Sequence, residues 1–99
     1  MAQRMEYEVV REWAASRYEA RTPDGTVVGI AEYVLAEGTI ELPHTVVPTE
    51  FEGQGIASAL ARAALRDARD GELKVIPTCW FIDSYIERHP EYWDLVSRG

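Results

Sequence analysis

The chain has 99 residues, of which 46% are hydrophobic, and these values predict one globular domain that spans residues 1–99. Its net charge of −7 argues against nucleic acid as the main partner, because a basic binding surface is missing. It lacks an apolar run long enough to cross a bilayer, and its one cysteine cannot form an internal disulfide. We therefore expect a cytoplasmic protein without a membrane partner.

Three strands are predicted in the first half of the chain, at 16–22, 27–36 and 40–47. The second is rich in β-branched and aromatic residues. The segments TPDGT at 22–26 and EGT at 37–39 separate the strands, because proline, aspartate and glycine favour tight turns. These spacings predict an antiparallel meander.

Pro43 lies inside the third predicted strand. Proline cannot donate a ladder hydrogen bond, so we expect a bulge or an opened edge at this position. His44 follows directly and lies beside that irregularity.

The second half of the chain changes to a helical period over 54–70. Gly71 ends this helix, and a short strand at 72–77 and a helix at 80–89 follow. The apolar stripe of the first helix contains Ile56, Leu60, Ala64 and Ala68. The order β-β-β-α-β-α predicts an α+β domain with a mainly antiparallel sheet, in which a β-α-β crossover at 40–77 makes two strands parallel.

Gly53 and Gly55 stand directly before the first helix. A helix start presents unpaired N–H groups, and glycines let a ligand approach the backbone, so this loop resembles a phosphate cradle. It is not a Walker loop, because Ile56-Ala57 stand where lysine and serine or threonine are needed. It is not a dinucleotide fingerprint, because Ser58 replaces the third glycine. A structural turn without a ligand is the alternative reading.

Four features in one order connect this loop with a known family. They are His44-Thr45, the pair Gly53 and Gly55, Pro77-Thr78-Cys79, and Tyr85 followed by His89-Pro90-Glu91-Tyr92. Over residues 16–97 the chain resembles the small stand-alone members of the GNAT superfamily of acetyl-CoA-dependent N-acetyltransferases. It departs from the family pattern at Glu50 and Glu52, where glutamine or arginine is usual, and at Trp80, where proline is usual.

The resemblance implies a minimal GNAT-like fold in which the two parallel strands splay apart. It implies acetyl-CoA as the donor, with the thioester between the ends of those strands, and an amine acceptor, either a protein lysine or a small amine. The implied pyrophosphate contacts are Gly53, Gln54, Gly55, Ile56, Ala57 and Ser58, and the pantetheine contacts are Thr45, Val46 and Val47.

Three residues are candidates for the chemistry of acetyl transfer. His44 is a candidate base for the amine, directly or through water, or else a structural strand histidine. Cys79 is a nucleophile, a thiol that lines the thioester pocket, or a buried small residue. Tyr85 lies where the superfamily often places the acid for the leaving thiolate, or it is a core aromatic. Direct transfer is the expected mechanism, and no metal ligands are expected.

Other readings of the sequence stay open. The chain is alternatively a CoA or acyl-CoA-binding module without catalysis, or an interaction domain with a vestigial loop. The acidic surface suits a cationic substrate, or it only keeps the protein in solution. The tryptophans Trp13, Trp80 and Trp93 are expected to be core residues or pocket walls. Arg62 and Arg66 are expected on a solvated helix face; the alternative is that they contact the adenosine phosphates from the helix flank.

Overall fold

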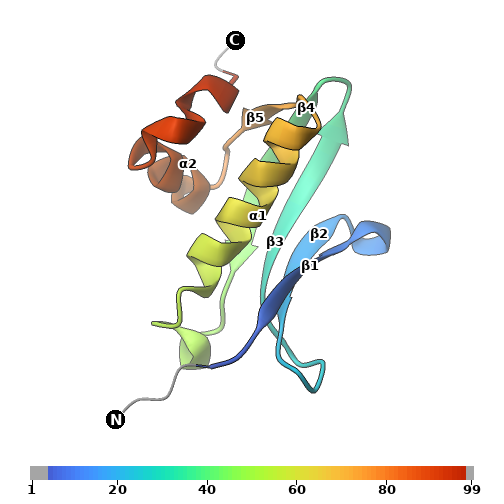
Figure 1. The fold of residues 1–99 in the computed structure, drawn as a ribbon, viewed down its shortest axis with the longest axis vertical. Coiled ribbons are helices and arrows are strands. Elements are labelled where there is room, and N and C mark those ends of the chain that lie inside the picture. The colour runs from blue at the N-terminus through green and yellow to red at the C-terminus, as the bar shows by residue number, and fades with distance from the viewer. Residues whose placement is uncertain (1–4, 98–99) are drawn as a thin grey trace.

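The computed structural model describes residues 5–97. Its elements within this range are, in chain order, β1 (Glu8–Glu12), η1 (Trp13–Ala15), β2 (Arg17–Arg21), β3 (Val27–Ala36), β4 (Thr39–Val46), η2 (Thr49–Phe51), α1 (Ile56–Asp70), β5 (Lys74–Ile76), α2 (Trp80–Glu87) and η3 (Pro90–Leu95). The strands form one sheet in the order β1-β2-β3-β4-β5 (Figure 1). All neighbours are antiparallel except β4 and β5, which are parallel.

The predicted α+β fold and the parallel pair made by the crossover are confirmed. The predicted strand order was incomplete, because β1 was missed. This strand pairs antiparallel with β2 over its whole length, from Glu8 opposite Arg21 to Glu12 opposite Arg17. Its sequence, EVVRE, has charges at both ends and no strong local strand pattern, so the neighbouring strand defines it.

Helix α1 lies across one face of the sheet, and α2 and η3 pack beside it (Figure 1). The predicted apolar stripe of α1 is buried, as are the sheet residues beneath it. Gly29 permits the close approach of α1 to β3, because a Cβ at this position would lie 2.6 Å from Cγ2 of Ile56. The first turn of α1 is thereby held directly against the sheet.

The sheet opens where β4 and β5 separate. These strands pair only from Thr39 with Lys74 to Glu41 with Ile76, after which the Cys79 N–H donates to the Leu42 carbonyl at 3.0 Å. Beyond Leu42, β4 pairs with β3 on one side, and no other strand of residues 5–97 pairs with its second side. The predicted splay is therefore present.

The predicted irregularity at Pro43 is also present. His44 pairs with Glu32, whereas Glu41 pairs with Val34, so two residues of β4 stand opposite one residue of β3. This arrangement is a β-bulge, which shifts the side-chain alternation by one residue. Before the bulge the even-numbered side chains of β4 face α1, and after it the odd-numbered ones do.

The three tryptophans were expected to be core residues or pocket walls. None of them is a core residue, whereas Trp93 lines a hollow of about 250 Å³ with Ile86, Glu87 and Val96. Trp13, Trp80 and Trp93 are 65%, 79% and 58% exposed. The Arg11 guanidinium lies 3.6 Å from the ring centroid of Trp13, and the Trp93 indole N–H donates to the Ile86 carbonyl at 2.8 Å. These contacts anchor two of the three rings at the surface.

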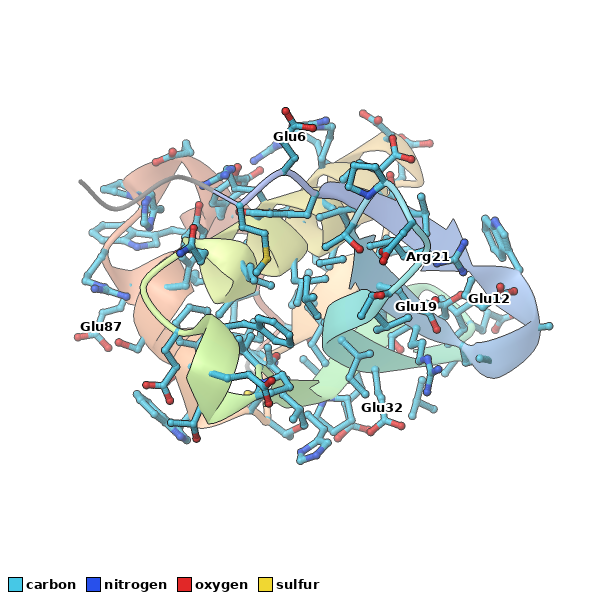
Figure 2. The ribbon with its side chains drawn as sticks, turned by 90° about the horizontal axis from the view of Figure 1, so that it is seen from below. Glu6, Glu12, Glu19, Arg21, Glu32 and Glu87 are labelled. Carbon is cyan, nitrogen blue, oxygen red and sulfur yellow. The ribbon has the colours of Figure 1, made fainter. Side chains whose placement is uncertain are left out.

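An ion-pair cluster lies on the sheet face away from α1, where Figure 2 shows Glu12, Glu19 and Arg21 together. The Glu19 carboxylate accepts hydrogen bonds from Arg21 at 2.8 Å and from Arg17 at 2.7 Å, although the residue is only 4% exposed. The hydrogen bond from Arg21 is the main cause that lowers the pKa of Glu19 below its usual value. Two arginines thus keep a buried carboxylate charged.

The structure contains no helix within residues 5–97 that is both long and apolar enough to cross a bilayer.

Candidate functional site

The glycine loop has the backbone conformation that its sequence predicts. Gly53 and Gly55 adopt φ angles of 84° and 75°, which residues other than glycine rarely adopt. Gly55 is the N-cap of α1 and supplies no side-chain hydrogen bond to the first turn. The first N–H groups of α1 therefore point out of a loop without a side-chain cap, at the positive end of a helix of 15 residues.

Two hollows meet at this loop. A groove of about 220 Å³ has an apolar lining that includes Val47, Phe51, Ile56 and Phe81. A more polar hollow of about 420 Å³ is lined by Tyr7, Gly53, Gln54, Gly55, Ser58 and Arg62. Residues shared by the two linings are Gly53, Gly55 and Ser58. The backbone of the loop is therefore accessible from both sides.

The N-terminal segment holds the loop in place, a role that the sequence analysis missed. The Tyr7 hydroxyl donates to the Gln54 carbonyl at 3.0 Å, and the Met5 N–H donates to Oε1 of Gln54 at 3.0 Å. Gln54 is separated from these residues by more than 45 positions in the chain. A contact over such a sequence distance leaves no local pattern by which it could be found.

The charges around the loop are mixed. Arg62 on α1 is the cation among the residues that line the polar hollow. Glu52 lines the apolar groove, whereas Glu50 is exposed and is not part of either lining. One of the two glutamates that depart from the family pattern thus stands beside the groove. Its negative charge opposes a phosphate there, while Arg62 favours one.

Cys79 lies at the mouth of the splay. It is half-buried at the N-cap of α2, and its thiol donates a long hydrogen bond to Oγ1 of Thr45, at 3.7 Å. Its backbone N–H makes the last backbone hydrogen bond between this segment and β4, to the Leu42 carbonyl. Thr45 and Cys79, both candidate residues, are therefore brought together by the structure.

His44 lies on the other face of β4. A Cβ on Gly29 would point at Val47 and at α1, so Val47 faces the helix layer, and Thr45 shares that face by strand alternation. His44 is exposed and pairs with Glu32 on the opposite face. The sequence predicts His44 and Cys79 near the same strand ends, whereas the structure places His44 on the face of β4 opposite to the one that Cys79 contacts through Thr45.

Tyr85 is held rigidly in α2, where it is 3% exposed. Its ring stacks on the His89 ring with a centroid distance of 3.9 Å, and Nδ1 of His89 donates to the Tyr85 carbonyl at 2.6 Å. Phe81 lies one helical turn earlier; its ring centroid is 6.3 Å from that of Tyr85, and it lines the apolar groove beside the glycine loop. Tyr85 therefore packs behind Phe81 and is not itself part of the groove lining.

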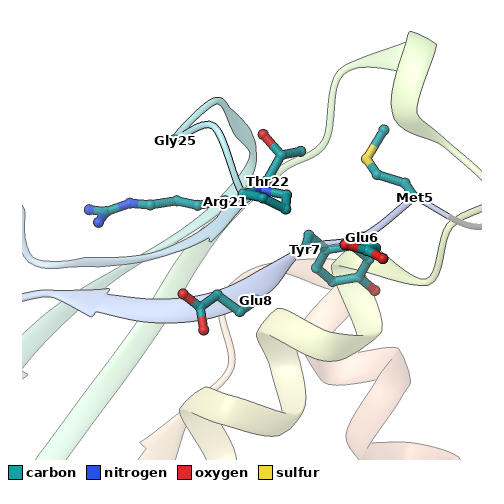
Figure 3. A pocket seen from close by; sticks show the side chains of 8 residues that line it. Met5, Glu6, Tyr7, Glu8, Arg21, Thr22 and Gly25 are labelled. Atoms are coloured by element: carbon teal, nitrogen blue, oxygen red, sulfur yellow. The ribbon is translucent and has the colours of Figure 1, made fainter.

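A further hollow of about 620 Å³ lies between the N-terminal segment and the hairpin of β2 and β3 (Figure 3). Its lining includes Glu6 and Glu8, and its cation, Arg21, already pairs with Glu12 and Glu19. An anionic lining does not suit a phosphate, so we assign no coenzyme contact to it. Over residues 5–97, side chains of histidine, cysteine, aspartate and glutamate form no group of three that could hold a metal ion.

The class of the protein is defined by its strand, glycine loop and helix start, which lie beside two parallel strands that splay apart. The chain belongs to the GCN5-related N-acetyltransferase family, whose family model matches residues 17–95.

Among its relatives is Protein NATD1 of Xenopus tropicalis, which is 44% identical over 59 residues, covering 60% of this chain and 53% of the relative. Protein NATD1 of Homo sapiens is 42% identical over 59 residues, covering 60% of this chain and 51% of the relative. The chain thus spans about half the length of the curated relatives that it matches. A GCN5-like protein of Staphylococcus aureus, solved by NMR, shares the fold with a TM-score of 0.71 and 24% identity, over 91% of this chain and 87% of that chain.

Proposed function

We propose that this protein is an acetyl-CoA-dependent N-acetyltransferase that acts on an amine by direct transfer. The observation that carries the proposal is the uncapped start of α1 behind two left-handed glycines, next to the unpaired edge of β4. Membership of the family supports acetyl transfer in general. The donor, the acceptor and the catalytic residues are the parts that we infer.

The backbone of the loop would hold the donor. In this proposal the N–H groups of residues 53–58 bind the pyrophosphate, with Arg62 and the Tyr7 hydroxyl at the edge of the same hollow. The free edge of β4 at Thr45 and Val46, together with Val47 directly after it, then pairs with the amide groups of the pantetheine arm, as a strand would. The groove next to the loop is lined by Phe81 and by Val47, the residue that follows β4.

The chain's own groups would then carry the proton transfers. Acetyl-CoA supplies an activated carbonyl, whose oxygen would accept a hydrogen bond from a backbone N–H near Val46. As the neutral amine attacks, the N–C bond forms and the C–S bond breaks. His44, on the opposite face, takes the proton that the amine loses, and Tyr85 protonates the leaving thiolate. This assignment has the donor on the α1 face and the acceptor on the face of His44.

Cys79 has two roles that an experiment separates. In direct transfer its thiol packs against the thioester, and Cys79→Ala keeps most of the activity. In a two-step route the thiolate takes the acetyl group first, so the same substitution abolishes turnover and wild-type protein accumulates an acetyl-thioester. The test is the rate of CoA release by Cys79→Ala together with the intact mass of wild-type protein after incubation with acetyl-CoA. Full loss of activity with a mass gain would overturn direct transfer.

A second candidate function is a CoA or acyl-CoA-binding module without catalysis. Two observations favour it: Glu52 lines the groove, and His44 and Cys79 lie on opposite faces of β4. Both functions need the loop, whereas only the enzyme needs an amine. Release of free thiol from acetyl-CoA in the presence of an amine panel distinguishes them.

Calorimetric titration with acetyl-CoA tests the loop itself. Gly55→Val introduces a side chain that points toward the Tyr7 hydroxyl and into the polar hollow, so binding should weaken at least about tenfold. Gly38→Val is the matched control, because Gly38 has a φ of 74° against 75° for Gly55 and open space around its Cβ. Both variants therefore place valine at nearly the same positive φ. Wild-type protein that binds no acetyl-CoA at millimolar concentration, or Gly55→Val that binds as wild type, would refute the proposal.

A further inference from the structure

Trp80 differs from the other two exposed tryptophans. Trp13 lies under the Arg11 guanidinium, and Trp93 donates its indole N–H to backbone carbonyls. Trp80 is 79% exposed, and its indole N–H has no hydrogen-bond partner among the residues that the structure describes. Its ring contact is with Phe81, edge to face at 6.3 Å. A large aromatic face is thus presented to solvent without a visible role in holding the fold.

The position of Trp80 connects it with the opening of the sheet. It follows Cys79, whose thiol contacts Thr45 at the splay. Two residues before Trp80, the Thr78 hydroxyl donates to Oε2 of Glu41 at 2.7 Å. Glu41 lies between the buried residues Ile40 and Leu42 of β4, so its carboxylate lies on the face away from α1, as His44 does. The Thr78–Cys79 segment therefore connects the two groups: Thr78 holds the Glu41 carboxylate by a hydrogen bond, and Trp80 follows Cys79 as the first residue of α2.

Two long segments around this opening carry acidic residues and no basic ones. Residues 22–61 contain no lysine or arginine, and 75–87 contain none either. The first of these segments carries the carboxylates Asp24, Glu32, Glu37, Glu41, Glu50 and Glu52. Lys74, the first residue of β5, donates from Nζ to the Asp94 carbonyl at 2.8 Å, and His44 is the titratable base on the face of Glu41. Carboxylates outnumber cations around the opening, which favours a cationic ligand at the indole face and the carboxylate.

We propose that Trp80 and Glu41 are specificity-determining residues that bind a positively charged group next to the reacting amine of the acceptor. The inference rests on the proposed function, because Cys79 marks where the acetyl group would be transferred. The reacting amine must be neutral when it attacks. The indole face and the carboxylate would therefore bind a second, positively charged group of the acceptor that does not react. The acceptor is accordingly a lysine with a basic neighbour.

The exposure of Trp80 favours a polypeptide acceptor over a free diamine. A ring that is 79% exposed lies on an open surface, whereas small ligands are usually enclosed in a concave pocket. An extended chain can lie across such a surface and contact Trp80 and Glu41 with one side chain while another enters the splay. The net charge of −7 favours the approach of a basic segment.

Two peptides test the proposal directly. One carries lysine followed by arginine, the other lysine followed by glutamine, and cadaverine serves as the free diamine. Binding is followed through the NMR signal of the Trp80 indole N–H, which is assigned by its absence in Trp80→Leu. We expect the lysine-arginine peptide to bind about five- to tenfold more tightly than the lysine-glutamine peptide, as one cation–π contact with a nearby carboxylate would give.

Variants locate the preference. Trp80→Leu and Glu41→Gln should remove the difference between the peptides, and Trp80→Phe should keep part of it because a ring remains. Glu41→Gln retains an oxygen that can accept the hydrogen bond from Thr78. Glu37→Gln is the control, since it removes the same charge from the turn between β3 and β4. Equal affinities of the two peptides, or an unchanged difference in Trp80→Leu, would overturn the inference, and cadaverine binding as tightly as the lysine-arginine peptide would overturn the choice of a polypeptide.

A titration with acetyl-CoA on the same sample distinguishes failure of this inference from failure of the proposed function. Titration with acetyl-CoA reports on the amide signals of Gly53 and Gly55, which are far in sequence from Trp80. If these signals do not move but the peptide preference is present, the proposed donor site fails and the cation site stands. If they move and the preference is absent, the proposed function stands and the inference fails.

Discussion

Gly29→Ala tests whether the start of α1 is set by its contact with β3. The Cβ of alanine would lie 2.6 Å from Cγ2 of Ile56, about 0.8 Å closer than ordinary contact, and 3.3 Å from both Leu60 and Val47. Gly29 is not among the described glycines with positive φ, so the backbone itself accepts alanine. The substitution therefore perturbs packing at one point, beneath the glycine loop.

Overpacking of this kind costs typically about 1–3 kcal/mol, because the neighbours must leave their preferred rotamers or the helix must move. Ile56 is 2% exposed and is the first residue of α1, so it has little free space into which to turn. Each kcal/mol lowers Tm by about 4–8 °C in a domain of this size. In urea unfolding, we expect Gly29→Ala to have a lower midpoint concentration than wild type and an unchanged m value.

A double-mutant cycle gives the decisive result. Ile56→Ala alone removes Cγ2 and should cost about 2–5 kcal/mol through the cavity it leaves. In the double variant the new methyl group at position 29 occupies part of that space, so Gly29→Ala should cost nothing further or should restore stability. Additive losses in the double variant would refute the reasoning, since they would mean that Gly29 and Ile56 do not compete for one volume.

Two further predictions concern the loop and the buried carboxylate. Tyr7→Phe removes the hydrogen bond to the Gln54 carbonyl and should lower the free energy of unfolding by about 1 kcal/mol. It should also weaken acetyl-CoA binding several-fold in calorimetry; an affinity equal to that of wild type would mean that the segment does not position the loop. The pKa of Glu19 is lowered in the folded state, so its stabilising contribution is present above the unfolded pKa of about 4.5 and is lost as pH falls through the lower folded value. The free energy of unfolding should therefore fall more steeply below pH 4.5 in wild type than in Glu19→Gln, measured by urea unfolding at each pH, and identical slopes would contradict the role of Arg17 and Arg21. Asp24 and Asp94 also have lowered pKa values, but they contribute equally to both proteins.

The local elements were predictable because their signals are local. The helical period and Gly71 define the end of α1 at Asp70, and the glycine-containing turns delimit β3 and β4 to within a residue. Left-handed φ angles at Gly53 and Gly55 follow from their place before a helix. The motif order identified the family without any knowledge of the sheet.

The remaining features depend on contacts between distant segments. β1 is a strand because β2 lies beside it, and Tyr7 reaches Gln54 only after the sheet has formed. Trp93 was expected in the core or as a pocket wall; it is 58% exposed, lines a surface hollow, and donates from Nε1 to the carbonyls of Ile86 and Glu87. Such contacts have no period or spacing in the sequence.

The face of each residue on β4 shows how far one local irregularity reaches. Ile40 and Leu42 face α1, and unbroken alternation would direct His44 to the same side, toward Cys79. The bulge at Pro43 inserts one residue, so Thr45 takes that side and meets the Cys79 thiol, while His44 moves to the face of Glu32 and Glu41. The sequence indicates the bulge through proline, but the exchange of faces appears only when the register on both sides is known. In the proposed reaction this exchange has a consequence: the donor would lie with Thr45 and Cys79, and the base would lie on the acidic face from which a cationic acceptor approaches.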